Sequence, residues 1–313
     1  MAGKRRIISL LPSATEIVCA LGAGPELVGI SHECDFPELV LGVPTLTASR
    51  LRVAISSARI DRDLRAMVRD ALSIYTVDES RLAALAPDCI VTQDLCQVCA
   101  VSLGDVQRAV ARLASRDEIQ VVSLRPTCLA HVLRDVETVA LALDRAERGR
   151  ELRHELEARI AAIAARAARA ANRPRVVTVE WLEPLMLGGT WMPELIELAG
   201  GEALAAKAGE CAPTLSLEAF AALEPEVVLI KPCGFKLDRT LQERAFIESE
   251  LLTRLGPSTR AFVSDGNAFF NRPGPRLVES LEILGACIHP ELFPDFAAKH
   301  RSVLLPLRAR DRH

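Results

Sequence analysis

The sequence has few aromatic residues and no long hydrophobic run. Phe, Tyr and Trp make up 4% of its 313 residues, with two tryptophans and a single tyrosine. No segment approaches the roughly 18 consecutive apolar residues of a membrane-spanning helix, so we expect no membrane insertion. The net charge is −3 at pH 7, which gives no excess of basic residues for binding nucleic acid or an anionic membrane.

The sequence also lacks the short motifs of common catalytic and nucleotide-binding sites. It contains no P-loop, no Rossmann glycine fingerprint, no nucleophile elbow and no HExxH. Gly22 and Gly24 follow an expected helix rather than a strand, so they do not indicate a phosphate-binding loop. These absences predict a protein that is not an enzyme.

Cysteine, by contrast, is abundant, with nine residues. Cys19 and Cys287 fall within apolar helical patterns and Cys89 begins an apolar strand, so we expect these three to be buried, inert thiols. Cys96 and Cys99 form a CxxC, a spacing that zinc, iron–sulfur and dithiol redox sites share.

The N-terminal segment does not have the pattern of a secretory signal. The apolar run that begins at Ile7 is broken early by Pro12 and Ser13, and no cleavage site follows. Ser13 and Glu16 instead fit the capping box of a following helix. We therefore expect a cytoplasmic protein, or a periplasmic one if a leader was removed. The cytoplasm keeps thiols reduced, which leaves metal or redox use of the cysteines open.

One long helix is predicted near the middle of the chain, because Leu152, Leu156, Ile160 and Ile163 recur at helical spacing. Pro174 stops it. The predicted domains are an α/β lobe over residues 1–144, the connecting backbone helix over 145–173, and a second α/β lobe over 174–313. The alternative is a surface helix of one large domain.

The two halves resemble each other. Residues 82–88 match residues 220–226, and both segments lead into an apolar strand. Alternating strands and helices in each half predict parallel-type sheets. The expected fold class is therefore α/β, with two lobes joined by one long helix. In such sheets, ligands bind beyond the carboxyl ends of the strands.

The expected strand ends carry the rare aromatic residues beside polar groups. Aromatic walls with a few polar groups suit a large, flat organic ligand. The alternative is that each aromatic residue packs its own loop. The candidate ligand-binding residues are Pro12, Ser13, Tyr75, Trp181, Trp191, Asp265, Asn267, Phe269 and Arg272.

Four cysteines also lie at or near expected strand ends, namely Cys34, Cys96, Cys99 and Cys233. We predict that they form a thiolate cluster that binds a soft metal ion or the metal centre of the ligand. Cys233 comes from the second lobe, which makes its participation the least secure. The alternatives are unrelated free thiols and a redox protein that uses the CxxC as a dithiol.

The opening of the chain resembles a known family. The segments IISLLPSATE at 7–16, LGAG at 21–24, LVGI at 27–30 and CDFP at 34–37 are similar to the opening of substrate-binding proteins of ABC importers for cobalamin and iron chelates. The resemblance extends from about Arg6 to Pro290. It implies two α/β lobes, one connecting helix, and a ligand bound between the lobes.

Within this class the chain is similar to the cobalamin binders. The resemblance implies that Trp181 and Tyr75 lie against the corrin of a corrinoid, and that Asp265 meets its amides. It also implies docking on an ABC permease through Glu218 in the second lobe. In the first lobe the docking position falls on Ser80, beside Glu79. The function left open as an alternative is binding of a metal ion or iron chelate by the cysteines.

Overall fold

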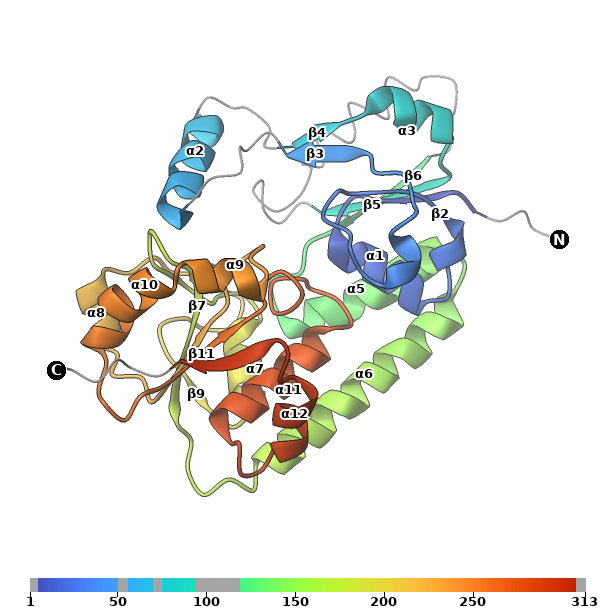
Figure 1. The fold of residues 1–313 in the computed structure, drawn as a ribbon. Helices are drawn as coiled ribbons and strands as arrows, with labels where there is room; N and C mark the ends of the chain where they lie inside the picture. Colours follow the sequence, from blue (N-terminus) through green and yellow to red (C-terminus); the bar gives the residue numbers. More distant parts are fainter. Residues whose placement is uncertain (1–4, 50–55, 70–74, 94–118, 308–313) are drawn as a thin grey trace. The chain divides into compact units, whose positions relative to one another are not determined.

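The computed structural model describes residues 5–49, 56–69, 75–93 and 119–307. They belong to two compact units, each with its own main sheet (Figure 1). Unit 1 comprises Met1–Ile55, Arg59–Pro126 and Ala130–Leu156, and unit 2 comprises Ser56–Ala58, Thr127–Leu129 and Glu157–His313. Within the described ranges, no helix has both the length and the apolar character needed to cross a membrane.

The main sheet of unit 1 is parallel throughout. Its strand order is β2 (Leu27–Ile30), β1 (Ile7–Ser9), β5 (Cys89–Gln93) and β6 (Gln120–Leu124). Every residue of β1 and β5 is buried, as expected for parallel strands that are covered on both faces. A separate antiparallel pair consists of β3 (Thr47–Ser49) and β4 (Tyr75–Val77).

Helices and short helical turns accompany these strands. They are α1 (Pro12–Ala20), η1 (Gly24–Glu26), η2 (Glu38–Val40), α2 (Ser57–Arg69), α3 (Glu79–Leu85) and α5 (Leu129–Ala142). The capping box predicted at Ser13 is wrong. The N-cap of α1 is Leu11, and Pro12 occupies the first helical position, where its fixed φ angle suits the helix and its missing N–H costs nothing.

The sheet of unit 2 has a parallel centre and antiparallel edges. Its order is β12 (Leu304–Leu307), β11 (Arg260–Ser264), β10 (Val227–Ile230), β7 (Arg175–Trp181) and β8 (Met186–Leu187), with β9 (Glu202–Ala203) beside the start of β7. Neighbours among β7, β9, β10 and β11 run parallel, whereas β8 and β12 run antiparallel to theirs. The parallel centre was expected, and the edge strands were not.

Short helical segments connect these strands. They are α7 (Met192–Leu198), α8 (Leu217–Ala221), α9 (Leu237–Gln242), α10 (Arg244–Phe246), η3 (Ile247–Leu251), η4 (Leu252–Arg254), α11 (Leu277–Ile288) and α12 (Pro294–Lys299). Helix α11 is buried at every position except Glu279, which makes it part of the core of unit 2.

The predicted long helix is α6 (Ala146–Ala167), and the boundary between the units falls within it, after Leu156. Its four predicted apolar residues are all buried, between 4% and 8% exposed. The stripe of Leu152, Leu156, Ile160 and Ile163 is therefore confirmed. The helix ends at Ala167, six residues before the predicted end of the connecting segment at residue 173, and turns lead from it to Pro174.

In both units, a capped helix precedes a central strand of the main sheet: α3 precedes β5 in unit 1, and α8 precedes β10 in unit 2. Asp78 caps α3 by accepting a hydrogen bond from a backbone N–H three residues on, and Ser216 caps α8 in the same way. Each helix is followed by a residue with a left-handed backbone, Ala86 with φ of 42° and Glu224 with φ of 45°. The sequence repeat therefore corresponds to a repeat of structure.

An acidic residue then joins the amino ends of two strands. The backbone N–H of Arg6, before β1, donates to Asp88 Oδ2 at 2.9 Å. The backbone N–H of Arg175, at the start of β7, donates to Glu226 Oε2 at 2.8 Å. These bonds align β1 with β5 and β7 with β10, so that the carboxyl ends of each pair lie at one edge.

Candidate functional site

The carboxyl ends of three parallel strands meet at one edge of unit 2. Val179 of β7 is paired with Ile230 of β10, which is paired with Val263 of β11. The residues that follow these positions therefore lie next to one another, at the edge where α/β sheets bind ligands. This edge carries most of the second-half candidates predicted from the sequence.

Trp181 is half-buried at this edge and is held from two sides. Its indole N–H donates to the carbonyl of Glu183 at 3.1 Å. Its ring meets Phe235 edge-to-face, with centroids 5.1 Å apart. Arg239 in turn places its guanidinium 4.3 Å above Phe235 and bonds Glu243 at 2.8 Å. Such contacts restrict the ring, so that little entropy is lost when a flat ligand binds against it.

A buried lysine lies directly after β10. The side chain of Lys231 is 0% exposed, and its Nζ donates to Glu180 Oε2 at 3.2 Å and to Asn271 Oδ1 at 2.8 Å. A buried ammonium is stable only with such partners. Glu180 is the penultimate residue of β7, and its side chain is 26% exposed. The edge therefore presents a carboxylate with a counter-charge behind it.

Asp265 shapes the loop that follows β11. Its Oδ1 accepts hydrogen bonds from the backbone N–H groups of Asn267 at 3.0 Å and Ala268 at 2.7 Å. The N–H of Asn267 also donates to the carbonyl of Phe235. The two predicted residues Asp265 and Asn267 thus lie in one turn, which is bonded to the backbone of Phe235, the residue whose ring contacts Trp181.

The other candidate residues of unit 2 are more buried than Trp181 or are in contact with other aromatic side chains of the protein. The indole of Trp191 is 6% exposed and donates to the carbonyl of Phe270 at 2.8 Å, which fixes the loop after β11. Arg272 is also 6% exposed. Phe269 is half-buried between Phe270 and His300, with centroids at 6.4 and 6.1 Å. Contact of these side chains with a ligand stays a prediction.

In unit 1, the corresponding edge holds a buried network of small polar groups. The Thr15 hydroxyl lies 2.8 Å from Ser9 Oγ and 3.0 Å from Cys34 Sγ. Cys34 is 6% exposed and Ser13 is 2% exposed, while Pro12 is half-buried at the start of α1. The structure thus places Pro12, Ser13 and Cys34 at the ends of β1 and β2.

The remaining first-half candidates are not described in full. For Tyr75 the structure describes the backbone, which pairs with Ser49 in the small sheet, but not the side chain. Cys96 and Cys99 lie outside the described residues altogether. The described residues contain no group of three or more His, Cys, Asp or Glu that could hold a metal ion. The predicted thiolate cluster therefore stays a prediction.

Three of the described cysteines have raised pKa values. Burial raises the pKa of Cys89 to about 11, and burial together with the nearby Glu16 carboxylate raises the pKa of Cys19 to about 11. Burial also raises the pKa of Cys287. High pKa values keep these thiols protonated and poor as nucleophiles or ligands. Cys89 and Cys287 are buried as predicted, whereas the prediction that Cys19 is buried is wrong, because this residue is half-buried on α1. Cys233 is half-buried, so its thiol is partly accessible at the edge of unit 2.

The proposed docking glutamates lie at the starts of equivalent helices. Glu218 is in the first turn of α8 and is exposed. Glu79 is the first residue of α3 and is half-buried. A backbone N–H and the Ser216 hydroxyl bond the Glu218 carboxylate and lower its pKa, which keeps it charged.

Sequence reasoning missed Glu180 and Lys231. The signal was a lysine that directly follows the apolar run of residues 227–230 and an acid within the last residues of the neighbouring strand. A charged residue at the end of a fully buried strand needs a partner nearby, and the parallel register supplies it.

Comparisons with known proteins agree with this geometry. Residues 7–260 match the family described as periplasmic binding protein. The vitamin B12-binding protein of Yersinia pestis (strain Pestoides F) is 24% identical over 276 residues, which cover 87% of this chain and 82% of that protein.

Two solved structures show the same fold. The periplasmic vitamin B12-binding protein of Vibrio cholerae superposes with a TM-score of 0.61 at 19% identity, covering 93% of this chain and 97% of that one. A periplasmic heme-binding protein from Pseudomonas aeruginosa gives 0.67 at 20% identity, covering 97% and 95%. The fold class predicted from the sequence is therefore confirmed.

Proposed function

Because the chain belongs to the periplasmic binding protein family, we propose that it binds a corrinoid, with cobalamin as the first candidate, and catalyses no reaction on it. The predicted resemblance to substrate-binding proteins of ABC importers is confirmed at the level of the family. Membership of the family does not by itself specify the ligand, so the choice of a corrinoid is our proposal. It is supported by the vitamin B12-binding relative and above all by one observation, the pre-positioned indole of Trp181.

The chemistry of the unit 2 edge suits such a ligand. A corrin presents an apolar face to an aromatic ring and a periphery of primary amides to polar groups. Trp181 offers the ring, and carboxylate oxygens come from Glu180 near the end of β7 and from Asp265 directly after β11, with β10 between these two strands. The predicted contribution of Tyr75 and of the other unit to the same ligand stays a prediction.

Two other ligand classes predicted from the sequence are kept as alternatives. An iron chelate such as heme agrees with the heme-binding structural relative, although that likeness shows the fold alone. Metal binding by Cys34, Cys96, Cys99 and Cys233, or a dithiol function of the CxxC, is untested. The observation behind the metal-binding alternative at Cys34 is its place among the polar groups after β2, with Sγ 3.0 Å from the Thr15 hydroxyl.

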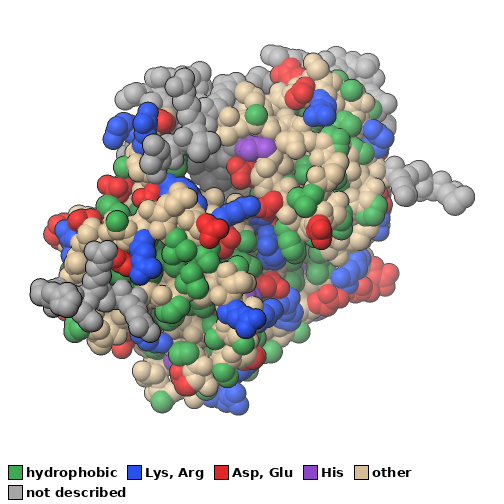
Figure 2. All heavy atoms as spheres, in the orientation of Figure 1, with side chains coloured by type: hydrophobic (Ala, Val, Ile, Leu, Met, Phe, Trp, Pro, Cys, Tyr) green, Lys and Arg blue, Asp and Glu red, His purple; other side chains and the backbone are tan. Residues whose placement is uncertain are grey.

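The proposed partners follow from the family. An ABC permease would dock through Glu218 and Glu79. Figure 2 shows acidic and basic side chains interspersed over the described surface on its visible face. The predicted lack of a nucleic-acid partner stays a prediction. The cytoplasmic location expected from the sequence stays a prediction, and comparing the soluble and periplasmic fractions of the source cells tests it.

An absorbance titration with cobalamin tests the proposed function. The parent protein should bind, and Trp181→Ala should weaken binding by ~1–3 kcal/mol, or about 5- to 150-fold, since an aromatic contact is lost. Trp181→Phe should lose less. Phe296→Ala is the matched control, because Phe296 stacks on Phe293 in a different aromatic cluster of unit 2. Absence of binding by any corrinoid at roughly 50 micromolar, a free energy weaker than about −6 kcal/mol, would reject the proposal.

A further inference from the structure

Glu180 is a carboxylate with a fixed side and an open side. On the fixed side, Oε2 accepts from Lys231, whose side chain is wholly buried. The backbone carbonyl of Glu180 also accepts from the N–H of Cys233 at 2.9 Å, which ties the end of β7 to the segment after β10. On the open side, no donor among the described residues bonds Oε1, and the side chain is 26% exposed.

The lysine behind Glu180 is itself held in place. Asn271 accepts from Lys231 Nζ and donates to the carbonyl of Gly266 at 2.8 Å. Gly266 lies so close to the carbonyl of Pro232 that a Cβ added there would be 2.1 Å from its oxygen. The loop after β11 is thus packed directly on the segment after β10, and the ammonium has no room to swing away.

These contacts hold Oε2 of Glu180 on the buried lysine and leave Oε1 at the carboxyl ends of the strands, where the side chain is partly exposed. The remaining lone pairs of that carboxylate can accept hydrogen bonds from a ligand, and bonds to a charged acceptor are about twice as strong as neutral ones. A ligand carboxylate at the same place would meet a like charge and would be repelled.

We propose that Glu180 selects ligands whose periphery carries hydrogen-bond donors, such as primary amides, and rejects ligands that carry carboxylates there. Lys231 is the positioning residue for this carboxylate. The inference rests on the proposed function and deepens it, because it separates amide-bearing corrinoids from their acid forms and from heme, whose propionates are anionic. The selectivity comes from this one fixed charge and needs no change elsewhere in the site.

The test compares two corrinoids that both lack the nucleotide loop. Cobinamide carries side-chain amides, and cobyrinic acid carries carboxylates in their place. The parent protein should prefer cobinamide. Glu180→Gln should bind cobinamide about fivefold more weakly, because a neutral acceptor replaces a charged one, and cobyrinic acid more tightly, because the repulsion is gone. The Kd for cobyrinic acid divided by the Kd for cobinamide should therefore fall at least about tenfold from the parent to Glu180→Gln.

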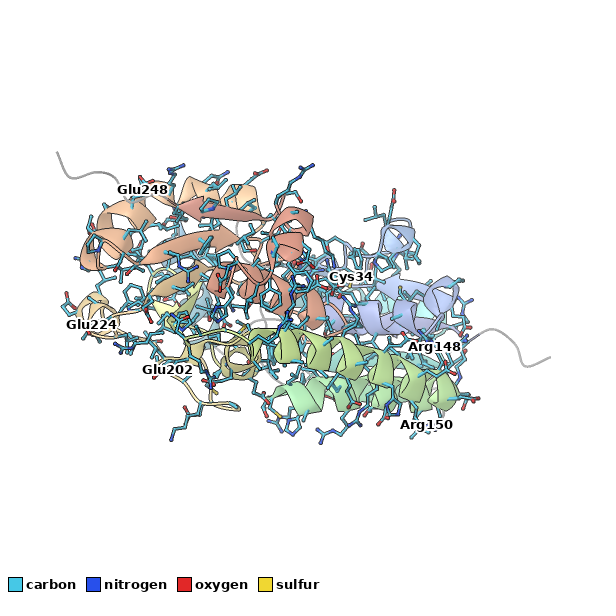
Figure 3. All side chains as sticks on the ribbon, turned by 90° about the horizontal axis from the view of Figure 1, so that it is seen from below. Cys34, Arg148, Arg150, Glu202, Glu224 and Glu248 are labelled. Atoms are coloured by element: carbon cyan, nitrogen blue, oxygen red, sulfur yellow. The ribbon has the colours of Figure 1, made fainter. Side chains whose placement is uncertain are left out.

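Glu202→Gln is the matched control. Glu202, labelled in Figure 3, is exposed on β9. Strand β9 pairs with the first residues of β7, at the opposite end of that strand from Glu180. This variant should keep the parent ratio. Lys231→Met should weaken cobinamide binding, because the carboxylate loses its positioning contact, but it should not tighten the binding of cobyrinic acid, because the carboxylate itself remains. Asn271→Ala replaces this variant if the buried methionine prevents folding.

The outcomes separate the two claims. If the parent binds cobinamide but Glu180→Gln leaves the ratio unchanged, the selectivity inference is overturned while corrinoid binding stands. A Glu180→Gln protein that is merely less stable, with both affinities reduced alike, also overturns the inference, since it indicates a structural ion pair. If the parent binds cobalamin but neither of these two compounds, the selectivity inference alone is overturned, and if it binds no corrinoid at all, the proposed function fails as well.

Discussion

Removing the charge of Glu282 should destabilise unit 2 in a pH-dependent way. Glu282 of α11 is 7% exposed at its side chain and accepts from His300 at 2.7 Å, from Lys299 at 2.6 Å and from Arg159 at 3.1 Å. Arg159 belongs to α6, while Lys299 and His300 lie at the end of α12. One carboxylate therefore fastens the second half of α6 to two helices of unit 2 (Figure 1).

The magnitude follows from the pKa. Burial alone would raise the pKa of Glu282, but the hydrogen bonds from His300, Lys299 and Arg159 outweigh it and lower the pKa from 4.5 to about 2. Such a shift corresponds to ~3 kcal/mol of stability, similar to the cost of breaking a buried ion pair. Because the folded-state pKa lies below the unfolded-state value, this stability is present above about pH 4.5 and is lost as the pH falls toward 2.

Urea unfolding followed by circular dichroism measures the effect. At pH 7, Glu282→Gln should be less stable than the parent by ~3 kcal/mol, and at pH 3 the difference should shrink to under about half. Glu291→Gln is the control, because Glu291 pairs with the buried His289 at 3.1 Å but is 64% exposed, so its loss should cost at most ~1 kcal/mol. A parent–variant difference that is the same at pH 7 and pH 3, or absent at pH 7, would refute the reasoning.

Two further predictions concern the cysteines and one close backbone contact. Protein purified without added metal should contain about one equivalent of zinc, copper or iron by elemental analysis, and Cys96→Ser and Cys99→Ser should each lose it, while Cys211→Ser, at an exposed cysteine, should not. Full metal content in both CxxC variants, or little metal in the parent, would remove the thiolate cluster. Gly266→Ala should cost ~1–3 kcal/mol by forcing the loop of Asp265 away from Pro232, and should weaken corrinoid binding. Gly256→Ala, whose added Cβ would have its nearest neighbour 3.8 Å away, should stay within ~0.5 kcal/mol, and equal urea midpoints for the two variants would contradict the close contact.

Much of the fold could be predicted because its signals are local. Leu27–Ile30 (LVGI) and Val227–Ile230 (VVLI) are short runs without polar side chains, and the structure has strands with these bounds. Helix α6 was predicted from a single apolar stripe. The edge strands β8 and β9 have two residues each, too few to show a period, and they form because the longer β7 lies beside them.

The site was predictable by position but less so by role. Parallel sheets bind ligands at strand ends, so Trp181 and Asp265 could be chosen from their place in the sequence. Whether an aromatic ring is open or buried depends on what packs on it from distant segments. Trp191 looks like Trp181 in the sequence, yet its indole is 6% exposed and bonds Phe270, 79 residues away. The Lys231–Glu180 pair is likewise a product of strand register.

The internal repeat shows where the constraints of the fold and of the ligand separate. At the amino ends of the strands the two units agree in detail: a capped helix, a left-handed residue, and an acid that bonds the backbone of an arginine. At the carboxyl ends they differ, with hydroxyls and a thiol around Thr15 in unit 1 and an ion pair beside an indole in unit 2. Both units must solve the same folding problem at the amino edge, so the same bonds recur there. The carboxyl edges are free of that requirement, so their side chains can diverge between the two units.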